Sequence, residues 1–154
     1  MSKFVYRMQN ILNLKYKLED QAKMEFAAAR RRLTEEEEKL ELLYRRKDGY
    51  EEEGRRLRED ALAVMDILEN RNAILQMEDF IELQKLEVAK AEEALETERQ
   101  KLQEVMQERK VQEKLREKAF EAFMKEENAK ESKEIDELVS YTYGQRKREK
   151  AGSL

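Results

Sequence analysis

The sequence contains no cysteine, proline, histidine or tryptophan, and only four glycines among 154 residues. Without cysteine there are no disulfides and no thiol chemistry, which suits a reducing compartment. Without histidine the chain lacks the commonest general base and metal ligand. Without proline, the residue that most strongly breaks helix interiors is missing.

Long apolar runs and catalytic motifs are also missing. No stretch of about 18 apolar residues occurs, so we expect no membrane-spanning helix. The opening Met1–Phe4 lacks the apolar core of a signal peptide. No glycine-rich phosphate-binding loop is present, and the carboxylates of Glu35–Glu38 would fan around a helix instead of converging in a cleft. We therefore expect a protein that is not an enzyme, with no cofactor, catalytic residue or metal site.

Charge is what the sequence has in abundance. Charged residues make up 44% of the chain, with 32 basic and 36 acidic side chains interspersed and a net charge of −4. This balance weighs against nucleic acid as the main partner. The basic clusters Arg30–Arg32, Arg45–Lys47 and Arg55–Arg56 each lie beside an acidic run, which indicates solvated helix faces with pairs four residues apart.

Apolar residues recur at alternating steps of three and four on both sides of Asn70–Asn72. Asparagine tolerates turn geometry, so we place a hairpin tip within about residues 69–76. The sequence predicts an all-α fold, a long antiparallel two-helix coiled-coil hairpin forming one domain over residues 1–144. Helix one should span about residues 3–69 and helix two about 75–143, followed by a basic disordered tail at 145–154. The predicted seam of helix one contains Leu40, Leu43, Lys47, Tyr50, Gly54, Leu57, Ala61, Val64 and Leu68.

A register follows if facing residues have numbers that sum to 145. It sets Lys47 opposite Glu98, Glu36 opposite Arg109, and Gly54 opposite Ala91. Opposite charges and small residues then meet at the polar and small sites of the seam. Such sites lower stability but fix the register of a coiled coil.

The N-terminal stretch predicts a helix beginning near Lys3 and capped by Ser2. Its apolar face then continues with two successive steps of four, a stutter that locally unwinds a coiled coil. This face contains Phe4, Met8, Ile11, Leu14, Leu18, Ala22 and Phe26. Val5, Tyr6 and Leu12 widen it, either as broader packing or as a partner-binding face.

Two further apolar groups lie outside the predicted seam. One flanks it near the middle of the chain and indicates either flank packing or an exposed docking strip. It contains Leu42, Tyr44, Ile67, Phe80, Leu83 and Leu86. The other precedes Gly144, a helix stop signal. It contains Ile135, Leu138, Val139, Tyr141 and Tyr143.

Motifs at both ends of the chain resemble those of a known family. The opening from Phe4 to Leu12, followed by Lys15 and Lys17–Glu19, is similar to the start of FliJ proteins. Lys114–Lys118, followed by Lys133–Glu137, resembles the second signature of that family. FliJ is the small coiled-coil component of the bacterial flagellar type III export apparatus.

The resemblance implies an adaptor or central stalk that docks in the hexameric export ATPase FliI and stimulates it. It also implies contact with the membrane export gate FlhA, a role in export-chaperone cycling, and a cytoplasmic location at the inner face of the cell membrane without direct insertion. The expected ATPase-binding residues are Phe4, Tyr6, Arg7, Tyr141 and Tyr143. The expected gate-binding residues are Phe80, Leu43 and Tyr50. The alternative is a holdase-like chaperone that binds unfolded export substrates through the same apolar ends.

Overall fold

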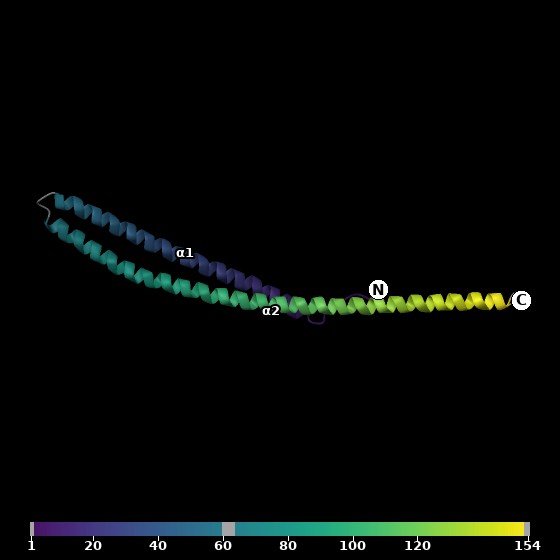
Figure 1. The fold of residues 1–154 in the computed structure, drawn as a ribbon. Helices are drawn as coiled ribbons and strands as arrows, with labels where there is room; N and C mark the ends of the chain where they lie inside the picture. Colours follow the sequence, from purple (N-terminus) through teal and green to yellow (C-terminus); the bar gives the residue numbers. More distant parts are fainter. Residues whose placement is uncertain (1, 60–63, 153–154) are drawn as a thin grey trace. The chain divides into compact units, whose positions relative to one another are not determined.

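The computed structural model describes residues 2–59 and 64–152, and two helices account for most of them. Helix α1 spans Gln9–Glu59 and helix α2 spans Val64–Gly152. The described residues contain no strand, and α1 packs antiparallel to α2 (Figure 1). The prediction of an all-α helical hairpin is therefore confirmed.

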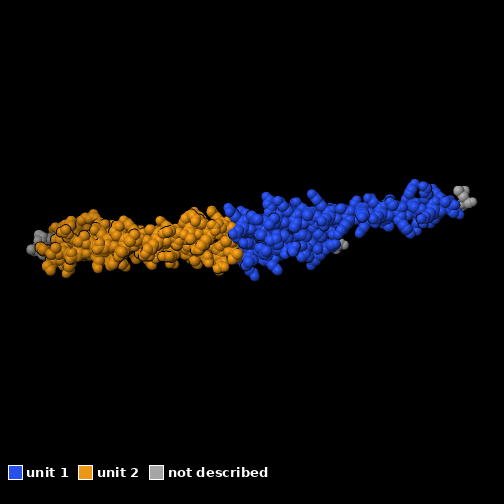
Figure 2. All heavy atoms as spheres, turned by 90° about the horizontal axis from the view of Figure 1, so that it is seen from below, with its two compact units in different colours: residues 1–17, 107–154 blue, residues 18–106 orange. Residues whose placement is uncertain are grey.

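The chain divides into two compact units, which we describe separately. Unit 1 comprises residues 1–17 and 107–154, and unit 2 comprises residues 18–106 (Figure 2). Unit 1 thus combines two separate segments of the chain, whereas unit 2 is one continuous segment. A single hairpin domain over residues 1–144 stays a prediction.

The position of the hairpin tip differs from the prediction. Helix α1 ends at Glu59 and α2 begins at Val64, so Asn70–Asn72 lie inside α2. Asn70 is only 8% exposed, and its Nδ2 donates a hydrogen bond to the Tyr50 carbonyl at 2.7 Å. A tip at Asn70–Asn72 is therefore wrong, as are helices at 3–69 and 75–143. The asparagine marks a polar seam site, because its amide is satisfied by the facing helix instead of by a turn.

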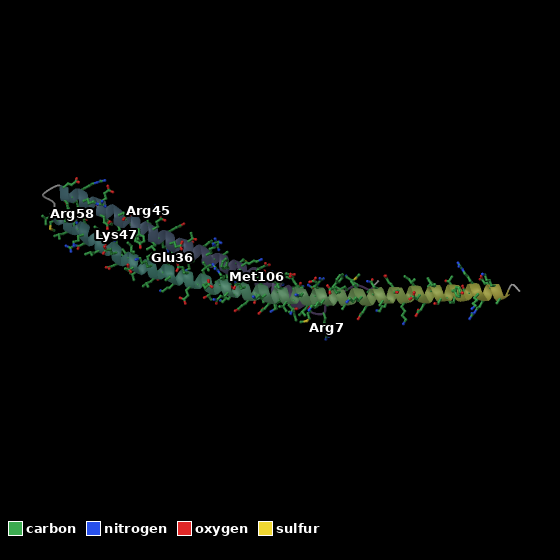
Figure 3. The ribbon with its side chains drawn as sticks, in the orientation of Figure 1. Arg7, Glu36, Arg45, Lys47, Arg58 and Met106 are labelled. Carbon is green, nitrogen blue, oxygen red and sulfur yellow. The ribbon has the colours of Figure 1, made fainter. Side chains whose placement is uncertain are left out.

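The register of unit 2 follows from its cross-helix pairs. Lys47 Nζ lies 3.5 Å from Glu78 Oε1, and Gln84 Nε2 donates to the Glu36 carbonyl at 3.0 Å. Facing residues therefore have numbers that sum to about 120–125. Lys47 and Glu36 both lie on α1 in Figure 3.

The register with a sum of 145 is wrong, by about three heptads. Lys47 does not face Glu98, and Gly54 packs against Asn70 in place of Ala91. A shift by whole heptads returns the same face of each helix to the seam, so the apolar pattern satisfies both registers equally. The seam positions 40–57 were predicted correctly; Val64 and Leu68 instead lie exposed on α2, and Ala61 lies outside the described residues.

The seam of α1 keeps an unbroken heptad towards its N-terminus. Leu12, Glu19 and Ala22 are buried, whereas Leu14 and Leu18 are exposed. The predicted stutter and the stripe through Leu14 and Leu18 are therefore wrong. The heptad of the seam positions 40–57, continued towards the N-terminus, places the charged residue Glu19 in the seam. That carboxylate lies 3.7 Å from the Lys23 amine.

Helix α1 begins at Gln9, not near Lys3, and Ser2 does not cap it. Residues 2–6 form an irregular segment, and the Gln9 N–H donates to the Tyr6 carbonyl at 3.1 Å. The Phe4 ring packs against Phe120 and Phe123, with centroids 5.2 and 5.4 Å away. Aromatic burial against α2 thus takes the place of two further helical turns.

Helix α2 passes through Gly144 and ends at Gly152. The described part of the predicted disordered tail, residues 145–152, is helical. Lys150 in the last turn is placed favourably for the helix dipole. Every residue from 128 to 143 is exposed, and unit 1 narrows to a single helix in this region (Figure 2).

Candidate functional site

Exposed apolar surfaces are the candidate sites of this molecule. Among residues 2–59 and 64–152, no group of three or more histidine, cysteine or acidic side chains is arranged to hold a metal ion. No helix within these ranges is long and apolar enough to cross a membrane. Apolar side chains left in water indicate binding to another macromolecule when they are contiguous.

The first surface, here called the α2 flank, is formed by Phe80, Leu83 and Leu86 in unit 2. All three are exposed, Phe80 by 43%. They line a hollow of about 440 Å³ together with Leu43 of α1 and polar side chains of α2. The structure therefore brings together two of the predicted gate-binding residues, Phe80 and Leu43.

Tyr50 does not join the α2 flank. Its side chain is half-buried in the seam, and its carbonyl accepts the Asn70 amide. Position 50 is thus part of the packing between the helices of unit 2. Leu42 and Tyr44 are exposed on α1, but they do not line the hollow beside Phe80.

Gln84 holds α2, the helix that carries the α2 flank, against Glu36 of α1. Its Nε2 donates both to the Glu36 carbonyl and to the Glu36 carboxylate. The bond to the carboxylate, helped by Lys39, lowers the pKa of Glu36 because it favours the charged form. On the exposed side, hydrogen bonding to Glu82 raises the pKa of Lys85.

In unit 1 the irregular residues 2–6 hold Phe4 and Tyr6 against α2. The Arg116 guanidinium lies 5.5 Å from the centre of the Phe4 ring, a cation–π geometry. Tyr6 is buried, and its hydroxyl donates to Gln112 Oε1 at 3.2 Å. Two of the five expected ATPase-binding residues, Phe4 and Tyr6, therefore serve internal packing. A third, Arg7, is exposed and is labelled in Figure 3.

Two polar contacts secure α1 against α2 in the same unit. Lys15 Nζ lies 2.8 Å from Glu108 Oε2. The Tyr16 hydroxyl donates to the Glu113 carboxylate, and this bond, followed by burial, raises the pKa of Tyr16. The first turns of α1 are thus tied to the helix that continues into the exposed C-terminal region.

The second surface, here called the C-terminal stripe, lies on the single-helix part of α2. Tyr141 and Tyr143 are 64% and 69% exposed. The stripe contains Ile135, Leu138, Val139, Tyr141, Thr142 and Tyr143. Among the described residues, no side chain from elsewhere in the chain covers it.

The aromatic residues expected to bind the ATPase do not lie together. Phe4 contacts Phe120 and Phe123, and Phe123 precedes Tyr141 by about 27 Å along the helix at 1.5 Å per residue. Sequence reasoning missed Phe120, Phe123 and Arg116 as partners of Phe4. The spacing of three residues between Phe120 and Phe123 could have indicated this contact, because it sets both rings on one face of a helix.

The model of the flagellar FliJ protein family matches residues 3–148. The chain belongs to the FliJ family. Membership of this family supports a role as a component of flagellar protein export, as a structural or adaptor protein. Comparisons with curated proteins and with solved structures each gave no match.

The two end motifs of this FliJ chain are structural partners. Arg116, from the motif Lys114–Lys118, stacks on Phe4 from the opening motif. Its Nε also donates to Gln9 Oε1 at 3.0 Å. The opening motif and Lys114–Lys118 thus meet in one packed cluster in unit 1, whereas Lys133–Glu137 is exposed.

Proposed function

We propose that this FliJ-family chain is an adaptor that links the export ATPase FliI to the export gate FlhA. In this role it stimulates the ATPase and assists the cycling of export chaperones, in the cytoplasm at the inner face of the cell membrane. The observation that supports the proposal is the pair of separate exposed apolar surfaces, one in each unit. An adaptor needs two contacts that can be occupied at once.

The C-terminal stripe is the proposed contact with the ATPase. A single exposed helix with an apolar face suits docking in a groove or a pore, because all its backbone polar groups are already satisfied within the helix. Tyr141 and Tyr143 offer large exposed contact areas, and Arg7 adds a charge in the same unit. Phe4 and Tyr6 contribute indirectly, by holding residues 2–6 against α2.

The α2 flank is the proposed contact with the gate. Phe80 and Leu43 border a hollow that a partner side chain could fill, and Glu87 and Lys90 at its edge offer charges of both signs. Truncating an apolar anchor at an interface centre typically costs more than truncating residues around it. Phe80 is therefore the anchor expected to matter most.

The two contacts should separate by mutation. The double variant Tyr141→Ala, Tyr143→Ala should weaken ATPase binding by about tenfold or more and reduce its stimulation, with gate binding unchanged. Phe80→Ala should weaken gate binding and leave ATPase binding unchanged. Binding of the purified chain to each purified partner, together with ATP hydrolysis rates, measures both effects.

Met24→Ala is the matched control, because Met24 is an exposed apolar residue of α1 outside both surfaces. It should change neither binding constant. The adaptor role would be refuted by two results together. The purified chain would neither bind nor stimulate its cognate ATPase, and a strain lacking the gene would still export flagellar proteins and swim. Binding of unfolded export substrates through the stripe, without ring binding, would instead support a holdase-like chaperone.

A further inference from the structure

The C-terminal stripe lies between two blocks of opposite charge on the same helix. Residues 125–139 contain six acidic and three basic side chains, a net charge of −3. Residues 140–152 contain four basic side chains and one acidic side chain, a net charge of +3. The helix from 125 to 152 is therefore an acidic half joined to a basic half, with apolar residues at the junction.

The apolar and charged positions follow one line along the helix. Glu131, Ile135, Leu138, Thr142 and Arg146 recur at steps of three and four, so they lie on one face. Ile135 and Leu138 are exposed, so this face is open over its apolar part. The line thus begins with an acid, passes through two apolar residues and a threonine, and ends with a base.

We infer that the C-terminal stripe binds the same helix of a second copy of this chain in antiparallel orientation. With facing numbers that sum to about 277, Ile135 faces Thr142 and Leu138 faces Val139. Glu131 then faces Arg146 at both ends of the pair, since the arrangement is two-fold symmetric. The acidic half of each copy lies along the basic half of the other.

A parallel pair would be opposed by the same charges. Each residue would then face its own copy, so Glu131 would meet Glu131 and Arg146 would meet Arg146, and such like-charge contacts are unfavourable. The helix is already formed as the continuation of α2, so pairing carries no cost of helix nucleation. Self-pairing would cover the stripe and exclude any other partner from it while the pair lasts.

The oligomeric state of the purified chain tests the pairing without any partner protein. We expect a concentration-dependent dimer in sedimentation velocity, weakened by salt because the facing charges are exposed. The variant Glu127→Lys, Glu131→Lys should be monomeric at concentrations where the unaltered chain is dimeric. The variant Arg146→Glu, Lys150→Glu should be monomeric as well. An equimolar mixture of the two variants should recover the dimer, because both halves of the helix then carry a net positive charge in one variant and a net negative charge in the other.

Cysteine variants test the orientation, and the native chain contributes no thiol of its own. Ile135→Cys mixed with Thr142→Cys should form an intermolecular disulfide faster than either variant alone. Like positions lie about 10 Å apart along an antiparallel pair, at 1.5 Å per residue. Lys133→Cys, on the opposite face of the helix, is the control and should not bridge.

Several results would overturn the inference. A chain that is monomeric at every concentration would overturn the pairing. It would do so even if the C-terminal stripe became buried on addition of the cognate ATPase. A dimer that persists in both charge variants, or a mixture that stays monomeric, would place any self-association elsewhere. Faster bridging between like positions would show a parallel pair. Because the purified chain alone is used, failure of the proposed ATPase contact would not affect these results.

Discussion

Gly54 and Asn70 form the most specific contact in the seam of unit 2. Both residues are buried, and a Cβ added at position 54 would collide with the Asn70 amide oxygen. The Asn70 amide nitrogen meanwhile donates to the Tyr50 carbonyl. Glycine allows the Asn70 amide to approach the α1 backbone this closely, although it costs the helix up to about 1 kcal/mol relative to alanine.

Gly54→Ala should destabilise the chain by about 1–3 kcal/mol, the usual range for an overpacked site. Gly49→Ala is the matched control: nothing lies within 4 Å of its added Cβ, so helix propensity alone should stabilise the chain. Chemical denaturation followed by circular dichroism measures both. Adding Asn70→Ala to Gly54→Ala should recover part of the loss, and strict additivity in this double-mutant cycle would contradict the contact.

The hydrogen bond from Gln84 to Glu36 predicts a dependence on pH. It lowers the pKa of Glu36 below the ordinary value of 4.5. Its contribution to stability is therefore present above that value and is lost as pH falls through the folded-state pKa. Gln84→Ala should raise the pKa of Glu36, measured by NMR titration of the side-chain carboxyl, while Gln103→Ala on the exposed face should not.

At the scale of the helices, heptad phase and register are separate properties. Phase follows from the spacing of apolar residues within each helix, and it is the same for pairings that differ by whole heptads. Register needs particular pairs, here Gly54 with Asn70 and Lys47 with Glu78. The sequence contained a second set of compatible pairs, including Lys47 with Glu98, and the structure does not use it.

Engineered disulfides distinguish the two registers. Gly54→Cys with Asn70→Cys should oxidise within one chain, because a Cβ at position 54 lies within 4 Å of the Asn70 side chain and replacing the asparagine relieves the collision. Gly54→Cys with Ala91→Cys corresponds to the other register and should stay reduced. Non-reducing electrophoresis with mass spectrometry reports both outcomes, and efficient bridging of the second pair alone would contradict the observed register.

At the scale of the molecule, each unit has its own source of stability. Unit 1 depends on the aromatic cluster of Phe4, Phe120 and Phe123, with Arg116 over the first ring. Unit 2 depends on a heptad seam in which Met77, Ile81 and Ala91 are buried. The cluster also positions the helix that leads into the C-terminal stripe.

Phe4→Ala should therefore destabilise unit 1 selectively, by about 1–3 kcal/mol for a half-buried aromatic residue. Amide hydrogen exchange should speed up in residues 9–17 and 107–123 and stay unchanged in residues 30–50 and 75–95. Val5→Ala is the control, because Val5 is the exposed neighbour. Equal acceleration in both units would contradict independent stabilisation.

The sequence by itself determined the helical class, the hairpin, and the seam positions 40–57 of the first helix. Apolar spacing within one helix decides which face is buried, and that is a local property of the chain. The resemblance to FliJ proteins also rested on residues readable in order, and the family match confirmed it.

Only the tertiary structure decided the register, the residues at which α1 ends and α2 begins, and which residues the two ends of the chain contact. Asn70 reads as a turn residue until the Tyr50 carbonyl is seen to accept its amide. Phe4 reads as a helical residue until Phe120 and Phe123 are seen beside it. Each of these choices depends on which distant residues meet, and a periodic sequence offers several pairings that differ only in a few specific contacts.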